Sequence, residues 1–290
     1  MTAQTTHPSP PRSAVGVDEL KRAWWAVQAG DYRRHPAVAS PATASTTSAR
    51  RQPSDARRWE PHEVVLPVIG CAGSVGATTL ALSLATAGAT AGARVIECCT
   101  VTASGLAPAS TAELGQHSSG GWLQGTRGEV LLERSSDILI GPDEVPQPTD
   151  AAATTGLTVL DVGWELGQLL ASPSWLVDRV LEPRPVVAVT TATIPGLRRL
   201  EGALALLEGS PVIAAVLGPP RRKWPRGVEH SIGALTRQLD QHEALHVLPL
   251  DRGLAVRGLD SEALPTPLLT AAHHILHASG AADTTKGNPS

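Results

Sequence analysis

The sequence of 290 residues contains no phenylalanine, one tyrosine and one methionine, although hydrophobic residues make up 42% of it. A buried core must therefore consist mainly of alanine, leucine and valine, whose small side chains suit the close packing of helices on a sheet. Charged residues are also scarce, at 18%, and the net charge is −3. A chain so close to neutral is not typical of a general nucleic-acid-binding protein.

Cysteines and long apolar runs are scarce as well. Cys71, Cys98 and Cys99 are the only cysteines and include no Cys-x-x-Cys pair, so we expect neither a disulfide framework nor a zinc site. Residues 1–13 lack the apolar stretch of a secretory signal peptide, and no apolar run approaches the roughly 20 residues that span a bilayer. These absences predict a cytoplasmic protein without a transmembrane segment.

The first 60 residues differ from the rest of the chain in charge and composition. They carry nine basic and five acidic residues, whereas the remainder carries 15 and 22. Residues 1–15 are rich in proline, serine and threonine, and residues 36–60 form a polar linker, so we predict a largely disordered basic arm over 1–60. The arginines of the linker either contact nucleic acid or an acidic lipid surface, or are simply solvated: Arg50, Arg51, Arg57 and Arg58.

One short amphipathic helix is predicted inside this arm, near residues 18–32. Its apolar residues Leu20, Trp24 and Val27 fall on one face at helical spacing. Trp24 and its neighbour Trp25 are costly to leave in water, because each carries a large apolar surface. The helix is therefore expected to dock either on its own domain or on a protein partner.

Residues 61–280 have the pattern of one folded domain, followed by a disordered tail at 281–290. Continuous apolar segments predict strands at 63–70, 94–99, 156–163, 185–192, 211–218 and 244–250. Amphipathic segments predict helices at 77–93, 194–209, 231–242 and 265–279. Apolar strands without alternation, separated by such helices, predict an α/β fold with a doubly wound, mostly parallel sheet covered by helices on both faces. Residues 106–150 leave open a hairpin or extra strands.

A glycine-rich loop, "GCAGSVGATT", joins the first predicted strand to the first helix. A strand, a loop and a helix in this order are the context of a phosphate-binding loop, whose backbone N–H groups cradle phosphates. Gly73 and Gly76 are expected to allow close approach and positive φ angles. Thr78 stands where a hydroxyl would bind Mg²⁺, and Ala77 stands where the phosphate-binding lysine belongs. The candidate nucleotide-binding residues are Gly73, Ser74, Val75, Gly76, Ala77, Thr78 and Thr79.

The loop resembles the deviant Walker A motif KGGVGKTT of the ParA/MinD family of partition and positioning ATPases, a P-loop NTPase family. The sequence here reads "AGSVGATT". Both lysines of the motif are missing, since alanines occupy positions 72 and 77, and Ser74 replaces the second glycine. The resemblance therefore points to a degenerate member of the family, and the composition is typical of a GC-rich genome such as those of actinobacteria.

The resemblance extends over most of residues 64–278. The segment "LTVLDVGWELG" is similar to the Walker B strand of the family, which places Asp161 where a carboxylate orients the water bound to Mg²⁺. A strand-end carboxylate that caps a turn is the alternative interpretation of Asp161. The family also carries a carboxylate pair after the second strand, but residues 100–102 here read Thr-Val-Thr, and the nearest carboxylate, Glu97, is expected within the strand.

These departures weaken the predicted site in two ways. Losing a hydrogen bond from a charged group costs roughly 1.5–3 kcal/mol, which lowers ATP affinity by about one to two decades. Phosphoryl transfer depends on stabilising charge, so without the lysines and the carboxylate pair we expect very slow hydrolysis or none. The implied cofactor is ATP or ADP with Mg²⁺, or no cofactor at all, with Thr78 and Asp161 as the metal-side residues if nucleotide binds.

Other cations could substitute for the missing lysines. The loop "GPPRRKWPR" follows a strand at the edge of the sheet where ligands bind in doubly wound folds. Its basic residues either contact a nucleotide or DNA, or are solvated: Arg221, Arg222, Lys223 and Arg226. Arg127 and Arg134 lie in the unassigned region. Neither the His273/His277 pair nor Cys71 is expected to form a site, since the pair has no third ligand and Cys71 is expected to be small and buried.

Three functions remain open at this point. The first is a cytoplasmic accessory or regulatory protein that acts through partner binding in partition, conjugative transfer, secretion or positioning, and is not an active ATPase. The second is an active switch that forms a homodimer around ATP. The third is a DNA-binding module that works through its arginine-rich segments. The cellular roles named here are implied by the resemblance to the ParA/MinD family.

Overall fold

The computed structural model describes residues 59–100 and 102–281. The predicted helix near residues 18–32, with Trp24 and Trp25, lies outside the described residues. So do the arginines at positions 50, 51, 57 and 58 and the last nine residues of the predicted tail.

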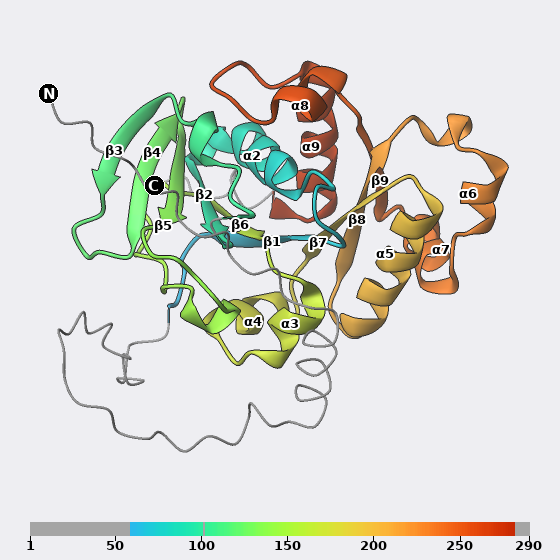
Figure 1. Cartoon of the computed structure of the whole chain (residues 1–290), viewed down its shortest axis with the longest axis horizontal. Helices are drawn as coiled ribbons and strands as arrows, with labels where there is room; N and C mark the ends of the chain where they lie inside the picture. The colour runs from blue at the N-terminus through green and yellow to red at the C-terminus, as the bar shows by residue number, and fades with distance from the viewer. Residues whose placement is uncertain (1–58, 101, 282–290) are drawn as a thin grey trace, which may run out of the picture. The chain divides into compact units, whose positions relative to one another are not determined.

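A nine-stranded sheet forms the centre of the domain (Figure 1). Its strand order is β3-β4-β5-β2-β6-β1-β7-β8-β9, and all neighbours pair in parallel except β3 with β4 and β4 with β5. The strands are β1 Val64–Gly70, β2 Ala93–Cys98, β3 Ala112–Gln116, β4 Trp122–Arg127, β5 Val130–Ser135, β6 Leu157–Val162, β7 Val186–Thr191, β8 Val212–Gly218 and β9 Leu245–Pro249. All six strands predicted from apolar segments are present, and the predicted mostly parallel α/β fold is confirmed.

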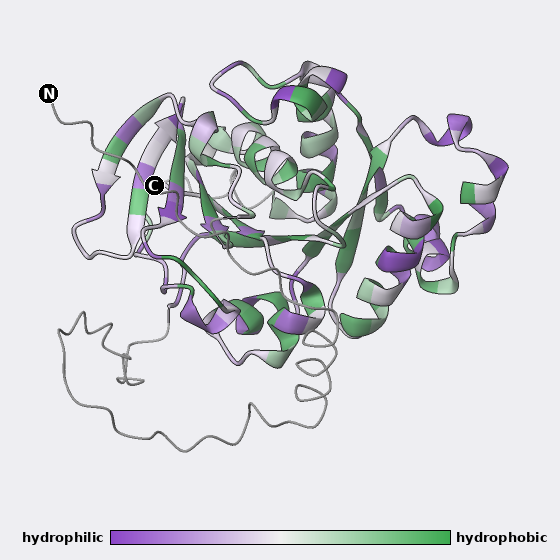
Figure 2. Cartoon of the chain, viewed as in Figure 1, coloured by the Kyte–Doolittle hydropathy of each residue, from purple (hydrophilic) through white to green (hydrophobic). Residues whose placement is uncertain are grey.

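Helices cover both faces of this sheet, with α2, α8 and α9 on one face and α3, α4, α5 and α7 on the other (Figure 1). The helices are α2 Ala77–Ala87, α3 Leu166–Ala171, α4 Trp175–Val180, α5 Ile194–Leu206, α6 Arg226–His230, α7 Ala234–Gln241, α8 Arg252–Arg257 and α9 Thr266–Ala278. Two hydrophobic clusters, one on each face, contain mainly leucine, valine, isoleucine and alanine. Figure 2 shows this apolar character along the central strands.

The region that the sequence left unassigned adds three strands to the edge of the sheet. β5 pairs in parallel with β2, β4 returns antiparallel to β5, and β3 returns antiparallel to β4. Trp122 of β4 is 1% exposed, and its indole N–H donates a 3.0 Å hydrogen bond to the carbonyl of Gln147. Residues 106–150 therefore extend the sheet and close part of its core.

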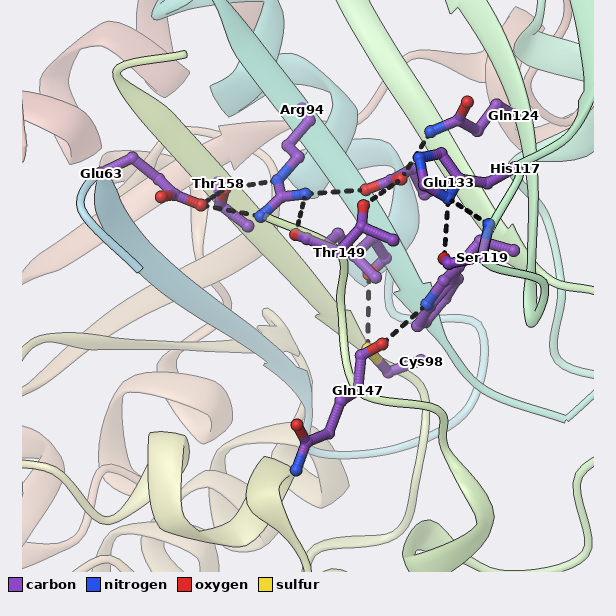
Figure 3. A network of polar contacts seen from close by, with 12 residues as sticks. Glu63, Arg94, Cys98, His117, Ser119, Gln124, Glu133, Gln147, Thr149 and Thr158 are labelled. Carbon is purple, nitrogen blue, oxygen red and sulfur yellow. Dashed lines mark hydrogen bonds and ion pairs between the residues drawn. The ribbon is translucent and has the colours of Figure 1, made fainter. Parts of the chain in front are cut away.

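A buried ionic network crosses the sheet near the start of β1 (Figure 3). The guanidinium of Arg94 contacts the carboxylate of Glu63 at 2.8 Å and that of Glu133 at 3.1 Å. Thr158 accepts a 2.8 Å hydrogen bond from the same guanidinium and donates a 2.6 Å hydrogen bond to Glu63. Because a buried charge is costly unless it is paired, this network ties β2, β5 and β6 to the residue before β1.

Trp59 belongs to the core, although the sequence analysis placed it at the end of the linker. Its side chain is 4% exposed and lies edge-on to Trp175, with ring centroids 5.4 Å apart. The guanidinium of Arg179 lies 5.1 Å from the centre of the Trp59 ring and donates a hydrogen bond to the Trp59 carbonyl. A single tryptophan at the end of a polar segment has no periodic pattern, so its burial could not be predicted from its neighbours.

Candidate functional site

The candidate site is built on the loop Cys71–Gly76, which leaves the carboxyl end of β1 and enters α2. β1 lies between β6 and β7 in the sheet, so the loop emerges from its centre. The backbone N–H of Cys71 donates a 2.8 Å hydrogen bond to the carbonyl of Val189 in β7, which fixes the start of the loop. Ligands of doubly wound sheets bind at this edge, outside the carboxyl ends of the strands.

The loop turns through two residues with positive φ, Ser74 at 59° and Gly76 at 89°. The sequence analysis expected this conformation at Gly73 and Gly76, so Ser74 takes the role assigned to Gly73. A left-handed conformation costs an L-residue roughly 1–2 kcal/mol, so Ser74 holds the shape at an energetic cost that a glycine would avoid. Gly73 contributes open space instead, since a Cβ added there would meet no atom within 4 Å.

The N–H groups of this loop are available to a ligand. Among the described residues, no backbone acceptor pairs with the N–H groups of Gly73, Ser74, Val75 or Gly76. The N-terminus of α2 follows directly, and the partial positive charge of a helix N-terminus attracts anions. The arrangement can therefore accept a phosphate-sized anion.

A cavity of about 930 Å³ opens above the loop, within the size range of small-molecule sites. Its wall combines the loop and the start of α2 with residues that follow β6, part of α5 and the segment from β9 into α8. Much of this wall is apolar, with Leu206, Leu217, Leu250 and Leu254 among the lining residues. The cavity thus joins a polar cradle at the loop to an apolar remainder.

Asp161 at the end of β6 is the buried acid of this cavity. Its side chain is 1% exposed, and burial, with a further contribution from the charge of Glu97, raises its pKa to about 7. The hydroxyl of Thr78 hydrogen-bonds to the carboxyl group and opposes this rise. The Oδ1 atom has no hydrogen-bond partner among the described residues. It therefore accepts no hydrogen bond from a backbone N–H group, as a carboxylate that caps a turn would.

Thr78 and Asp161 are the residues that could hold Mg²⁺, while the N–H groups of the loop could hold a phosphate. An orphaned, buried carboxylate oxygen beside a threonine hydroxyl fits the oxygen-ligand preference of that ion. The loop does not supply the positive charge that a triphosphate requires, because the uncharged residues Ala72 and Ala77 line the cavity. The residues present therefore fit the phosphate and the metal, and lack the lysines that would neutralise a triphosphate.

The stretch after β2 contains no carboxylate that could orient water. Glu97 lies within β2, as expected, and is 3% exposed. It accepts hydrogen bonds from the hydroxyl of Ser104 at 2.7 Å and from the N–H groups of Gly105 and Leu106 at 2.8 Å each. Both oxygens of Glu97 are thus occupied in folding the turn that places Gly105 beside Thr78.

The basic loop after β8 does not reach the cavity, since none of its cations is among the lining residues. Arg221 pairs with Glu229 at 3.4 Å and with Asp240, and its guanidinium lies 5.4 Å from the centre of the Trp224 ring. The other three basic residues of the loop are exposed: Arg222, Lys223 and Arg226.

The two arginines of the 106–150 region are also engaged elsewhere. Arg127 donates a 3.0 Å hydrogen bond to the carbonyl of Ala109, and Arg134 pairs with Glu113 at 2.6 Å. Neither lines the cavity. None of the basic residues singled out in the sequence therefore replaces the missing lysines in the cradle.

The remaining candidates are Cys71 and the pair His273/His277. Cys71 is half-buried in the cavity wall rather than buried as expected, and desolvation still raises the pKa of its thiol to about 12, so the thiol is protonated near neutral pH. His273 and His277 are exposed on α9. In the part of the chain that the structure describes, no group of three or more His, Cys, Asp or Glu side chains could hold a metal ion.

The cavity residues that the sequence analysis did not single out include Arg199 on α5 and Trp164 after β6. Trp164 is 5% exposed, and its indole N–H has no partner among the described residues. Arg199 is exposed and lines the cavity together with Gly202, Ala203 and Leu206. Helical spacing alone would have grouped these four residues of α5, but only the fold shows which face of α5 borders the cavity.

The fold and the loop define the class of the domain. A doubly wound sheet, a glycine-rich loop between its central strand and a helix, and a carboxylate at the end of the adjacent strand form the arrangement of a P-loop NTPase fold. No helix among the residues placed by the structure has the length and apolarity to cross a membrane.

Comparison with known proteins gives similarities at the level of structure. No family model matches the sequence, and no curated protein matches it significantly. A plasmid partition protein of Borrelia burgdorferi B31 bound to AMPPNP is 12% identical, with 74% of this chain and 97% of that chain covered at a TM-score of 0.46. A ParA family ATPase from Chlorobium tepidum TLS is 13% identical, with 77% and 99% covered at a TM-score of 0.45.

The MinC:MinD cell division complex of Aquifex aeolicus gives a similar match. It is 16% identical, with 74% of this chain and 96% of that chain covered at a TM-score of 0.47. These structural neighbours are ParA/MinD-type proteins, the family that the motif at residues 72–79 resembles.

Proposed function

We propose that the protein is a ParA/MinD-like accessory or regulatory protein whose nucleotide site is degenerate. It binds a phosphate-bearing nucleotide weakly, hydrolyses it very slowly or not at all, and acts by binding a protein partner. One observation carries the proposal: the cavity keeps an open loop with free N–H groups, yet alanines stand at positions 72 and 77. The shape that receives a phosphate is present, and the charges that stabilise its transfer are absent.

Weak binding is supported by the residues of the loop. The N–H groups of the loop and the N-terminus of α2 supply a partial positive charge to a bound phosphate. Asp161, Glu165 and Asp251 are acidic residues of the same cavity and work against an anion. Without a lysine from the loop, we expect an affinity about one to two decades below that of a site that has one.

The proposed loss of hydrolysis is supported by Glu97 of β2, whose carboxylate is already hydrogen-bonded within the fold. When bound with a nucleotide, Mg²⁺ would neutralise part of the negative charge of the phosphates, and Thr78 and Asp161 would hold the ion. The remaining tasks require cations and a residue that orients water. Both oxygens of Glu97 accept hydrogen bonds from residues 104–106, so Glu97 is not available for that role.

A partner is supported by apolar side chains at the edge of the cavity. Leu206 is 52% exposed and Leu250 is 53% exposed, and both line the cavity. A single exposed leucine is normal on a protein surface, but two that line the same cavity offer an apolar area that another molecule can cover. The processes in which such a partner would act are those of the ParA/MinD family: partition, conjugative transfer, secretion or positioning.

Calorimetric titration with Mg²⁺-ATP, combined with a phosphate-release assay, tests the proposal. We expect weak binding without turnover above the background of the buffer. The matched variant Gly73→Asp places a negative charge in the cradle without a clash, since a Cβ at Gly73 meets no atom within 4 Å. It should abolish the binding while leaving the thermal unfolding temperature unchanged.

Two outcomes would overturn the proposal. Tight binding with sustained turnover would indicate an active ATP-dependent switch. No heat of binding at millimolar nucleotide would remove nucleotide from the function altogether.

A further inference from the structure

One arginine supplies positive charge to the cavity. Of the described residues that line it, Arg199 is the only lysine or arginine, whereas Asp161, Glu165 and Asp251 are acidic. The loop that should carry the cations has alanines at positions 72 and 77. The positive charge at this cavity thus comes from α5, on the opposite face of the sheet from α2.

The position of Arg199 follows from helical spacing. Arg199, Gly202, Ala203 and Leu206 stand at i, i+3, i+4 and i+7 of α5, and all four line the cavity. Gly202 leaves space beside the arginine, because a Cβ added there would meet no atom within 4 Å. The neighbouring Arg198 is also exposed but is absent from the cavity wall.

The guanidinium of Arg199 is free to bind a ligand. Within the described part of the chain, its side chain forms no ion pair and no hydrogen bond. Besides Asp161, the acidic residues of the cavity are Glu165 and Asp251, and each caps the N-terminus of a helix. Glu165 accepts a 2.8 Å hydrogen bond from the N–H of Gln168, and Asp251 accepts one of 2.8 Å from the N–H of Leu254.

We propose that Arg199 is the anion-binding residue of this cavity and replaces the missing loop lysines in holding a phosphate-bearing ligand. The inference rests on the proposed function and names the residue that makes weak nucleotide binding feasible. A guanidinium suits this role because it is always charged and can donate two parallel hydrogen bonds to a phosphate. The apolar remainder of the cavity, with Leu217 and Leu254, accepts the uncharged part of the same ligand, so a nucleoside di- or triphosphate fits better than free phosphate.

Calorimetric titrations with Mg²⁺-ADP, Mg²⁺-ATP and pyrophosphate test the role of Arg199. The protein is compared with Arg199→Ala, Arg199→Lys and Arg198→Ala, the last being a matched control that removes the same charge from the adjacent position. We expect Arg199→Ala to weaken nucleotide binding by about tenfold or more, as expected for the loss of a hydrogen bond to a charged group. Arg199→Lys should retain part of the affinity, and Arg198→Ala should match the unchanged protein.

The variants separate this inference from the proposed function. Equal losses in Arg199→Ala and Arg198→Ala, or no loss in either, would overturn the role of Arg199 while leaving the nucleotide site in place. If Arg199→Ala weakens binding but Gly73→Asp does not, the ligand is held by Arg199 outside the cradle, and the proposed nucleotide site is wrong. If the unchanged protein binds none of the three probes, both conclusions fail. Unchanged thermal unfolding of Arg199→Ala shows that the exposed side chain is not needed for folding.

Discussion

Arg94 and Glu63 form an ion pair of 2.8 Å in which the arginine side chain is 2% exposed and the glutamate side chain is fully buried. The second carboxylate on the same guanidinium, Glu133, is 1% exposed. Burial opposes ionisation of Glu63, but the hydrogen bond from Thr158 and the charge of Arg94 together lower its pKa below the usual value. The pair therefore stays ionised inside the sheet, where the carboxylates of Glu63 and Glu133 share the positive charge of Arg94.

Replacing Arg94 by alanine should strongly destabilise the fold. Removal of one partner from a buried pair leaves an uncompensated charge, which costs about 3–5 kcal/mol. Urea unfolding followed by circular dichroism gives the change in the free energy of unfolding. The exposed pair Arg257–Asp260 provides the control, and Arg257→Ala should change stability by about 1 kcal/mol or less. Similar losses in both variants would mean that the buried network has no special structural role.

The stability of the protein should depend on pH through Asp161. The pKa of Asp161 is about 7 in the folded state and near 3.8 in the unfolded chain, so the folded state binds the proton more tightly. Protonation of Asp161 stabilises the folded state fully below about pH 4, and this stabilisation is lost as the pH rises to about 7. Each pKa unit of the shift corresponds to about 1.4 kcal/mol.

Asp161→Asn isolates this contribution, because asparagine has a similar shape and does not ionise. The difference in unfolding free energy between the variant and the unchanged protein should move in favour of the variant as the pH rises from 4 to 7. Other groups titrate in both proteins and cancel in the difference, including His246, whose pKa is lowered by burial and by His274. A difference that stays constant over this interval would contradict a raised pKa for Asp161.

Restoring a lysine at position 77 should strengthen nucleotide binding. Ala77 is the first residue of α2 and lines the cavity, so a longer side chain there has room to extend toward a bound phosphate. We expect Ala77→Lys to improve the affinity for Mg²⁺-ATP about ten- to hundredfold in calorimetry. Ala77→Gln is the control for side-chain length without charge. Equal affinities of the two variants would show that charge at this position is not what the site lacks.

The three thiols should react slowly in the folded protein. Burial raises the pKa of Cys71 to about 12, and it also raises the pKa values of Cys98 and Cys99. Thiolate is the reactive form, so an aromatic disulfide reagent at pH 7.5 should label the native protein slowly and label three thiols after denaturation. Rapid labelling of one thiol, lost in Cys71→Ser, would instead identify the half-buried Cys71 as reactive.

The layout of the sheet was predictable where a strand is buried on both faces. β1, β6, β7 and β8 are continuous apolar segments between polar ones, and such segments are recognisable without knowledge of their neighbours. For the strands of residues 112–135, the sequence left open a hairpin or extra strands. β3 is exposed along its whole length, and β4 mixes glycine, glutamine and threonine, so neither carries a clear apolar period.

The candidate site, too, was predictable from the sequence only in part. The order of strand, loop and helix located the cradle, and Asp161 followed from the resemblance of its strand. The conformation of the loop was assigned to the wrong residue, because glycine at position 73 suggested a positive φ that Ser74 adopts instead. The basic loop after β8 was considered from its charge alone, whereas its first arginine is paired with Glu229 and Asp240 in the structure.

The sequence by itself determined that the chain forms an α/β domain with a glycine-rich loop that has alanines at positions 72 and 77. These properties are encoded in residues that are close together in the chain. Only the tertiary structure decided which distant side chains share the cavity. In the folded chain, Asp161 lies beside Thr78, and Glu97 binds the turn next to them. Arg199 of α5 lies in the wall of the cavity above the loop. The physical reason is that a parallel sheet gathers the carboxyl ends of strands that are far apart in sequence, and local patterns do not encode which helix face meets them there.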